Sequence, residues 1–86
     1  MSIHEKLVQR LLSRPRNFTY DEMVRLLQGF GYTEQERGKT SGSAVMFYNE
    51  KLKDKILFHK PHPGKELKFY ILTLVIEQLQ KNKMIN

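Results

Sequence analysis

The hydrophobic pattern of this chain changes its period twice, and this change constrains the fold more than any other feature. Apolar residues recur at helical spacing up to Phe30, alternate within the stretch from Ser43 to Lys60, and return to helical spacing after Gly64. A chain of 86 residues can bury little more than one layer of helices on one small sheet. We therefore expect an α+β fold in the order α-α-β-β-β-α, with a three-stranded antiparallel sheet packed on helices.

Two amphipathic helices are predicted in the first third of the chain. The apolar face of the first consists of Ile3, Leu7, Val8, Leu11 and Leu12. Ser13-Arg14-Pro15 ends this helix, and the segment from Arg14 to Asn17 makes it the one element expected to be detachable. Thr19 and Glu22 have the spacing of a capping box, which predicts where the second helix begins. Its apolar stripe consists of Tyr20, Met23, Val24, Leu27 and Phe30, and it ends at Gly29 and Gly31.

Three extended segments are expected to form the sheet. They cover residues 32–37, 43–48 and 55–60, with turns at 38–42 and around residues 51–54. Alternation places Val45, Phe47, Ile56 and Phe58 on one face and Ala44, Met46, Leu57 and His59 on the other. Pro61 and Pro63 cannot donate hydrogen bonds to a neighbouring strand, so the last strand should end near Lys60.

A final helix is predicted after Pro63-Gly64. Its apolar stripe, at spacings of three and four residues, consists of Leu67, Ile71, Leu74, Val75 and Leu79. The stripe suits packing against one face of the sheet.

Composition and charge exclude several kinds of site and favour one kind of partner. The chain has no cysteine, which excludes disulfides and thiolate metal sites, and we expect neither a metal nor another cofactor. It lacks a secretory signal and any apolar stretch long enough to cross a bilayer, so we expect a cytoplasmic protein. The net charge is +6, and more of it lies in the second half of the chain, which makes nucleic acid a candidate partner.

Histidines and lysines are the residues that could carry chemistry. His59 and His62 lie three residues apart, where a strand end and a proline-rich loop bring imidazoles and ammonium groups together, whereas His4 is expected to be an ordinary surface residue. His62 could act as an acid or base, or it could be a turn residue that bonds to the backbone. The lysines of this half could contact phosphates, and they could equally protect exposed strand edges from aggregation.

Two segments, Gly38–Phe47 and His59–Lys68, resemble the HicA toxin family, with His62–Leu67 as the most specific part. The resemblance spans Tyr20 to Leu79. It implies a double-stranded-RNA-binding-like fold, messenger-RNA interferase activity and inhibition by a HicB antitoxin. The length of the chain predicts a single domain over residues 1–86, and compared with the family its N-terminal helix at 1–14 is extra to a core at 18–80.

The resemblance places Ala44 where the family has its catalytic histidine. A methyl group cannot transfer protons, so a metal-independent endoribonuclease with Ala44 should be inactive or weakened. The substitution has three explanations: a deliberate change to a toxic protein, a natural branch with relocated chemistry, or a natural branch that only binds. Relocated chemistry would make His62 catalytic. The residues expected to contact RNA are Lys39, Ser43, His59, Lys60, Lys65 and Lys68.

Three functional hypotheses follow from the sequence. The first is a HicA-like toxin that acts on messenger RNA and is held by a HicB-like antitoxin. The second is a non-catalytic RNA-binding module of the same fold, which would use the same basic face. The third is a protein-interaction domain whose open sheet face or extra helix docks an antitoxin without meeting RNA.

Overall fold

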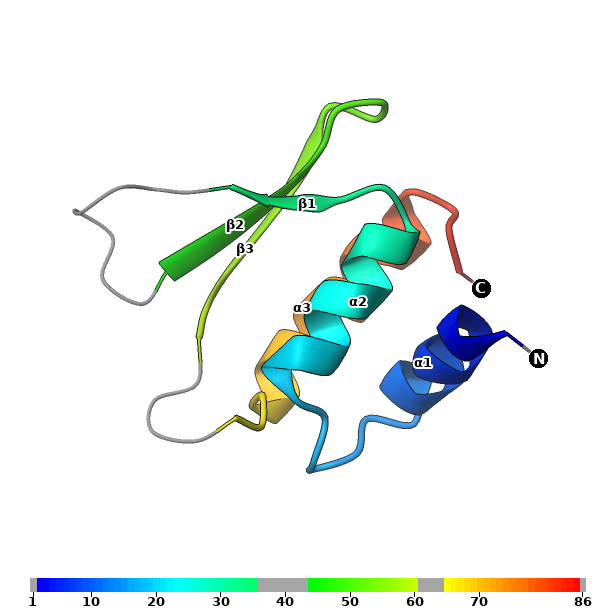
Figure 1. The fold of residues 1–86 in the computed structure, drawn as a ribbon, viewed down its shortest axis with the longest axis vertical. Helices are drawn as coiled ribbons and strands as arrows, with labels where there is room; N and C mark the ends of the chain where they lie inside the picture. The colour runs from blue at the N-terminus through cyan, green and yellow to red at the C-terminus, as the bar shows by residue number, and fades with distance from the viewer. Residues whose placement is uncertain (1, 36–43, 61–64, 86) are drawn as a thin grey trace.

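The computed structural model describes residues 2–35, 44–60 and 65–85, and within them the predicted order of elements is confirmed. The chain forms two helices, α1 (Ile3–Leu12) and α2 (Tyr20–Gly29), then three strands, β1 (Thr33–Gln35), β2 (Ala44–Asn49) and β3 (Asp54–His59), and last the helix α3 (Phe69–Lys81). Figure 1 shows the strands gathered on one side of the helices. The predicted turn at residues 38–42 lies outside the described residues.

Side-chain caps define where the first two helices begin. The Thr19 hydroxyl accepts a hydrogen bond from the Glu22 backbone, and the Glu22 carboxylate accepts one from the Thr19 backbone, so the predicted capping box is confirmed. Ser2 and Glu5 form the same reciprocal pair before α1. Each box satisfies backbone N–H groups that the first turn of a helix leaves without partners.

The strands form one antiparallel sheet in the order β1-β2-β3. The side chains predicted to face the helices are buried: Val45, Phe47, Ile56 and Phe58. Their neighbours in sequence lie on the opposite face, which we call the open face. It consists of Thr33, Gln35, Ala44, Met46, Tyr48, Lys55, Leu57 and His59, and these side chains are half-buried or exposed. The predicted alternation is therefore confirmed.

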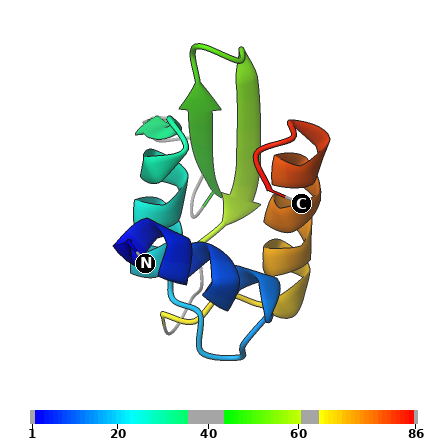
Figure 2. The same ribbon diagram turned by 90° about the vertical axis from the view of Figure 1, so that its right-hand side faces the viewer.

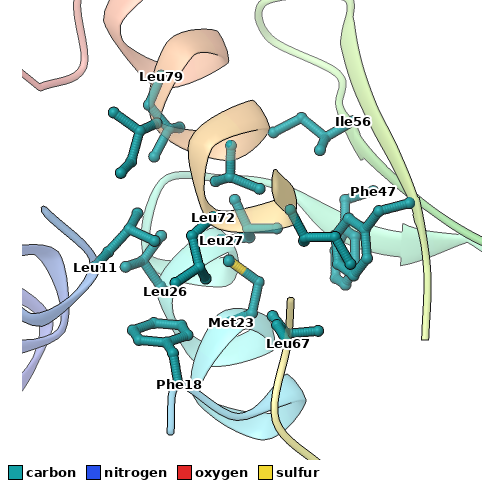
Figure 3. Packing of buried hydrophobic residues seen from close by; sticks show 14 of the residues in the cluster. Leu11, Phe18, Met23, Leu26, Leu27, Phe47, Ile56, Leu67, Leu72 and Leu79 are labelled. Atoms are coloured by element: carbon teal, nitrogen blue, oxygen red, sulfur yellow. The ribbon is translucent and has the colours of Figure 1, made fainter. Parts of the chain in front are cut away.

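The helices form two layers on one side of the sheet. Helices α2 and α3 run in the same direction with their N-termini at the same end, and α1 crosses over them on the side away from the strands (Figure 2). The core lies between the sheet and the helices and continues between the two helix layers. Its buried side chains come from all three helices and from β2 and β3 (Figure 3). The open face is thus the side of the sheet that no described helix covers.

The first helix is part of the core, which corrects the expectation that it is detachable. Leu11 is 0% exposed and belongs to the same cluster as Leu26 on α2. The Arg10 guanidinium donates two hydrogen bonds to the Glu22 carboxylate, at 2.6 and 3.1 Å. Apolar periodicity shows that a helix has a face to bury, but it does not show what that face packs against.

His4 also departs from its expected surface position. Its Nε2 lies 3.2 Å from the Leu26 carbonyl oxygen, and its ring meets the Phe30 ring edge-on, with centroids 4.5 Å apart. Gly29 permits this approach, because a Cβ at that position would overlap the imidazole. His4 is therefore a half-buried packing residue between α1 and α2.

The buried face of α3 is rotated from the predicted stripe. Ile71, Val75 and Leu79 are buried as predicted, together with Leu72 and Ile76, whereas Leu74 is 38% exposed. Leu67 is buried but precedes the helix. Because α3 packs on the sheet and also borders α1, its buried side covers residues at i, i+1, i+4, i+5 and i+8, a wider face than a single stripe.

A polar cluster centred on Asp54, at the hairpin end of the sheet, joins the start of β3 to Tyr32 after α2 and to the C-terminal end of α3. The Asp54 carboxylate accepts hydrogen bonds from the Tyr32 hydroxyl at 2.6 Å, Gln78 Nε2 at 2.7 Å and Asn82 Nδ2 at 2.9 Å. Burial raises the pKa of Asp54, but the three hydrogen bonds outweigh burial and hold the pKa below its ordinary value. The ionised carboxylate therefore fastens β3 to α3.

We expect the domain to lose stability in acid because of Asp54 and Glu22. The hydrogen bond from Arg10 lowers the pKa of Glu22, and the pKa of Asp54 is also lowered. The unfolded chain therefore takes up protons first as the pH falls. The free energy of unfolding should be level near neutrality and decline below pH 4.5, the ordinary pKa of glutamate, as the pH approaches the folded values.

Urea unfolding followed by circular dichroism at several pH values measures this decline. In Glu22→Gln and Asp54→Asn the decline should be smaller than in the parent, while Glu77→Gln on the exposed face of α3 should follow the parent curve. Equal declines in all four proteins would show that neither carboxylate is responsible.

Candidate nucleic-acid interface

Ala44 and His59 lie next to each other on the open face. They are partners in the antiparallel register of β2 and β3, an arrangement that places Cβ atoms about 4.5 to 5.5 Å apart. Together with Leu57 and Phe58 they line a hollow of about 170 Å³. Ala44 is half-buried and His59 is exposed, so a ligand on this face can reach both positions.

Lys60 follows His59 in sequence but leaves the strand on the other side. Its Nζ lies 5.1 Å from the centroid of the Tyr20 ring, which belongs to α2 and packs against Phe47 and Phe58 on the helix side of the sheet. At this distance the ammonium group is attracted to the face of the ring. His59 and Lys60 therefore point toward different sides of one sheet edge, whereas the sequence suggested one mixed cluster.

Lys65 reaches the same end of the domain through the backbone. Its carbonyl oxygen accepts a hydrogen bond from the Tyr20 backbone at 2.9 Å, and Glu66 forms a β-bridge with Thr19. Tyr20 is thus contacted by Lys60 through its ring and by Lys65 through its backbone. The sequence indicated Tyr20 only as a member of a helical stripe, and no short-range signal points to this second role.

Lys68 is the residue before α3 and completes what we call the basic end: Lys60, Lys65 and Lys68. The Lys65 and Lys68 side chains are exposed. Helix α3 begins here with no side-chain cap and no acidic residue in its first turn, so its unpaired backbone N–H groups give this end a partial positive charge. Glu66 is the only acidic residue between Lys60 and Lys68. The basic end can therefore attract anionic groups such as phosphates.

Three of the predicted site residues, Lys39, Ser43 and His62, lie outside the described residues. Their roles remain predictions. Ser43 directly precedes Ala44 in the chain, and His62 lies between Lys60 and Lys65.

Two further properties concern the described part of the chain only. Within residues 2–35, 44–60 and 65–85, no three histidine or carboxylate side chains gather closely enough to hold a metal ion. In the same ranges, no helix has the length and apolar character needed to cross a membrane.

Comparison with known proteins identifies the family. A family model described as the HicA toxin of bacterial toxin–antitoxin matches residues 20–80. The chain belongs to the HicA toxin family. No curated protein and no solved structure matches it.

The HicA match agrees closely with the span of the resemblance seen in the sequence, Tyr20 to Leu79. It covers α2, all three strands and α3 up to residue 80, so the paired residues Ala44 and His59 and the basic end all lie within the HicA region. Helix α1 lies outside the match, although its Leu11 is part of the same core.

Proposed function

We propose that this HicA toxin binds messenger RNA along the open face and the basic end, and that it is an endoribonuclease weakened by Ala44. The pairing of Ala44 with His59 on an accessible face, at the edge of the sheet where Lys60 follows on the other side, is the observation that most supports this proposal. The setting would be the cytoplasm, where messenger RNA is translated.

The proposed reaction needs a base and an acid and no metal. A base removes the proton of a ribose 2′-hydroxyl, which then attacks its own phosphate, and an acid protonates the 5′-oxygen that leaves. The family resemblance assigns proton transfer to an imidazole at position 44. With alanine there, catalysis forfeits a factor of about 10² to 10⁴. In this proposal His59 contacts the phosphate, and His62 is the second candidate for proton transfer.

The basic end supplies the proposed phosphate contacts, and its lysines provide a test. The variant Lys60→Gln/Lys65→Gln should bind RNA of every sequence more weakly, and the slope of log affinity against log salt should become shallower by about 1 to 2, because each lost phosphate contact releases one counterion fewer. Filter binding over a range of salt concentrations measures both quantities.

A matched control separates local contacts from net charge. Lys6→Gln/Lys51→Gln removes the same charge from exposed positions on α1 and on the β2–β3 turn. It should leave the affinity and the salt slope close to those of the parent. Equal losses of RNA affinity in the two double variants would show that Lys60 and Lys65 act only through net charge, as solubilising residues.

Two alternatives use the same surfaces and predict different results. A non-catalytic RNA-binding module would bind RNA with a steep salt dependence and stay inactive after an imidazole is placed at position 44. A protein-interaction domain would show no salt-dependent RNA binding at all. Relocated chemistry would appear as RNA cleavage by the parent that is lost in His62→Ala.

The partner proposed from family membership is a HicB-like antitoxin. A neighbouring reading frame that encodes such a protein would support the toxin over both alternatives. Co-expression of that protein should then relieve growth arrest caused by an active form of the toxin.

A further inference from the structure

We propose that Phe69 and Tyr70, at the start of α3, form a stacking surface for unpaired bases of RNA. This inference rests on the proposed RNA binding and adds to it the class of RNA recognised. It concerns a surface separate from the open face, since both residues lie on the helix that covers the opposite side of the sheet.

The two rings are unusually exposed for residues of a helix that supplies much of the core. Phe69 is 64% exposed and Tyr70 is 56% exposed, whereas the next two residues, Ile71 and Leu72, are at most 2% exposed. Leu74, one turn after Tyr70, is also partly exposed. The outer side of α3 therefore carries aromatic surface that packing within the domain does not explain.

The start of α3 is firmly held, so the rings occupy defined positions. The Leu67 backbone donates a hydrogen bond to the Phe18 carbonyl oxygen at 2.7 Å, and the Leu67 side chain is buried. The Lys68 carbonyl oxygen accepts the first helical hydrogen bond, from Ile71 at 3.0 Å. A surface fixed in this way loses little conformational freedom when a ligand binds.

The charge around the rings complements a nucleic acid. Exposed Lys68 directly precedes Phe69, exposed Lys65 lies four residues before it with exposed Glu66 between the two lysines, and the whole chain carries a net charge of +6. Proteins that bind single-stranded nucleic acid combine these two elements, positive side chains along the phosphate backbone and aromatic rings under the bases.

The area of the patch argues against a stable protein partner. Aromatic side chains have about 150 to 250 Å² of surface each, so Phe69, Tyr70 and Leu74 together expose on the order of 300 Å². A stable protein interface needs about 800 Å² on each partner. The patch is large enough for RNA, because a single base can stack on a single ring. Each stacked base strengthens binding by about 5- to 150-fold.

The bases recognised must be unpaired. Bases in a duplex stack on one another and expose only their edges, whereas bases in loops and single strands are free to stack on side chains. We therefore expect the aromatic pair to favour single-stranded RNA over duplex RNA of the same length.

The test compares binding of single-stranded and duplex RNA to the full chain. The probes are a fluorescein-labelled 2′-O-methyl oligouridine, which cannot be cleaved through its own 2′-oxygen, and a 2′-O-methyl duplex of equal length. Phe69→Leu/Tyr70→Leu should weaken single-strand binding by about tenfold or more and leave the salt slope unchanged, because the variant removes rings and no charge. Duplex binding should change little.

Leu52→Ala is the matched control, since Leu52 is an exposed apolar residue on the β2–β3 turn. It should bind both probes as the parent does.

A parent that binds neither probe would overturn the proposed RNA binding together with this inference. A parent that binds both, with an unchanged single-strand affinity in Phe69→Leu/Tyr70→Leu, would overturn the stacking surface alone. Loss of binding to a purified HicB-like antitoxin, with RNA binding intact, would reassign the rings to a protein partner and overturn it as well.

Discussion

Ala44→His should raise the rate of RNA cleavage by about 10² to 10⁴-fold, equivalent to roughly 3 to 5 kcal/mol of activation free energy. The change places an imidazole on the open face directly across from His59. A phosphate bound on that face between the two side chains would contact both rings. The exchange should be tolerated, because the open face is not packed against any described helix. Cleavage should need no metal, leave 2′,3′-cyclic phosphate ends and be fastest near neutral pH.

Two control variants test whether position and proton transfer matter. Met46→His places the same ring on the open face one cross-strand pair further along, opposite Leu57. Ala44→Gln places a polar side chain without a titratable group at the proposed site. Neither should cleave RNA above the level of the parent. If Ala44→His folds normally and leaves RNA intact, the nuclease assignment fails in favour of the binding module.

Leu11→Ala should lower the free energy of unfolding by about 2 to 5 kcal/mol, a large part of the total for a domain of this size. Leu11 is fully buried in the core cluster although it comes from α1, outside the HicA match. Truncation removes its apolar contacts and leaves a cavity that the surrounding helices can only partly close. Urea unfolding followed by circular dichroism measures the loss.

Leu12→Ala is the neighbouring control on the same helix. Leu12 is 37% exposed, so its truncation should cost clearly less, within about 1 kcal/mol. A small and equal effect of the two substitutions would indicate that α1 contributes little to the core, as the sequence alone suggested.

Most of the fold could be predicted because local pattern and chain order agree. The Thr19–Glu22 capping box determined the start of α2, and strict alternation assigned Val45 and Phe47 to the buried side of β2. The rotation of α3 could not be predicted, since Leu74 and Leu72 are equally apolar and only the packing of neighbouring helices decides between them.

For the candidate site, the sequence could predict the face on which residues lie but not how they pair across the strands. Alternation placed Ala44 and His59 on one face, but their pairing depends on the register of the β2–β3 hairpin. That register is determined by a turn in which the Asn49 side chain accepts a hydrogen bond from the Leu52 backbone and donates one to the Phe30 carbonyl. Lys53 adopts a positive φ of 54° in the same turn. Non-glycine residues seldom adopt this conformation, so sequence rules do not anticipate it.

The position of α1 has a practical consequence for binding measurements. Because α1 crosses the helices on the side away from the strands, its first residues and the open face lie on opposite sides of the molecule (Figure 2). A sensor chip coupled through a linker before Ile3 would present the sheet toward the flowing solution. Coupling through lysine amines would instead modify the basic end, so a chip prepared in that way would block the surface that it is meant to probe.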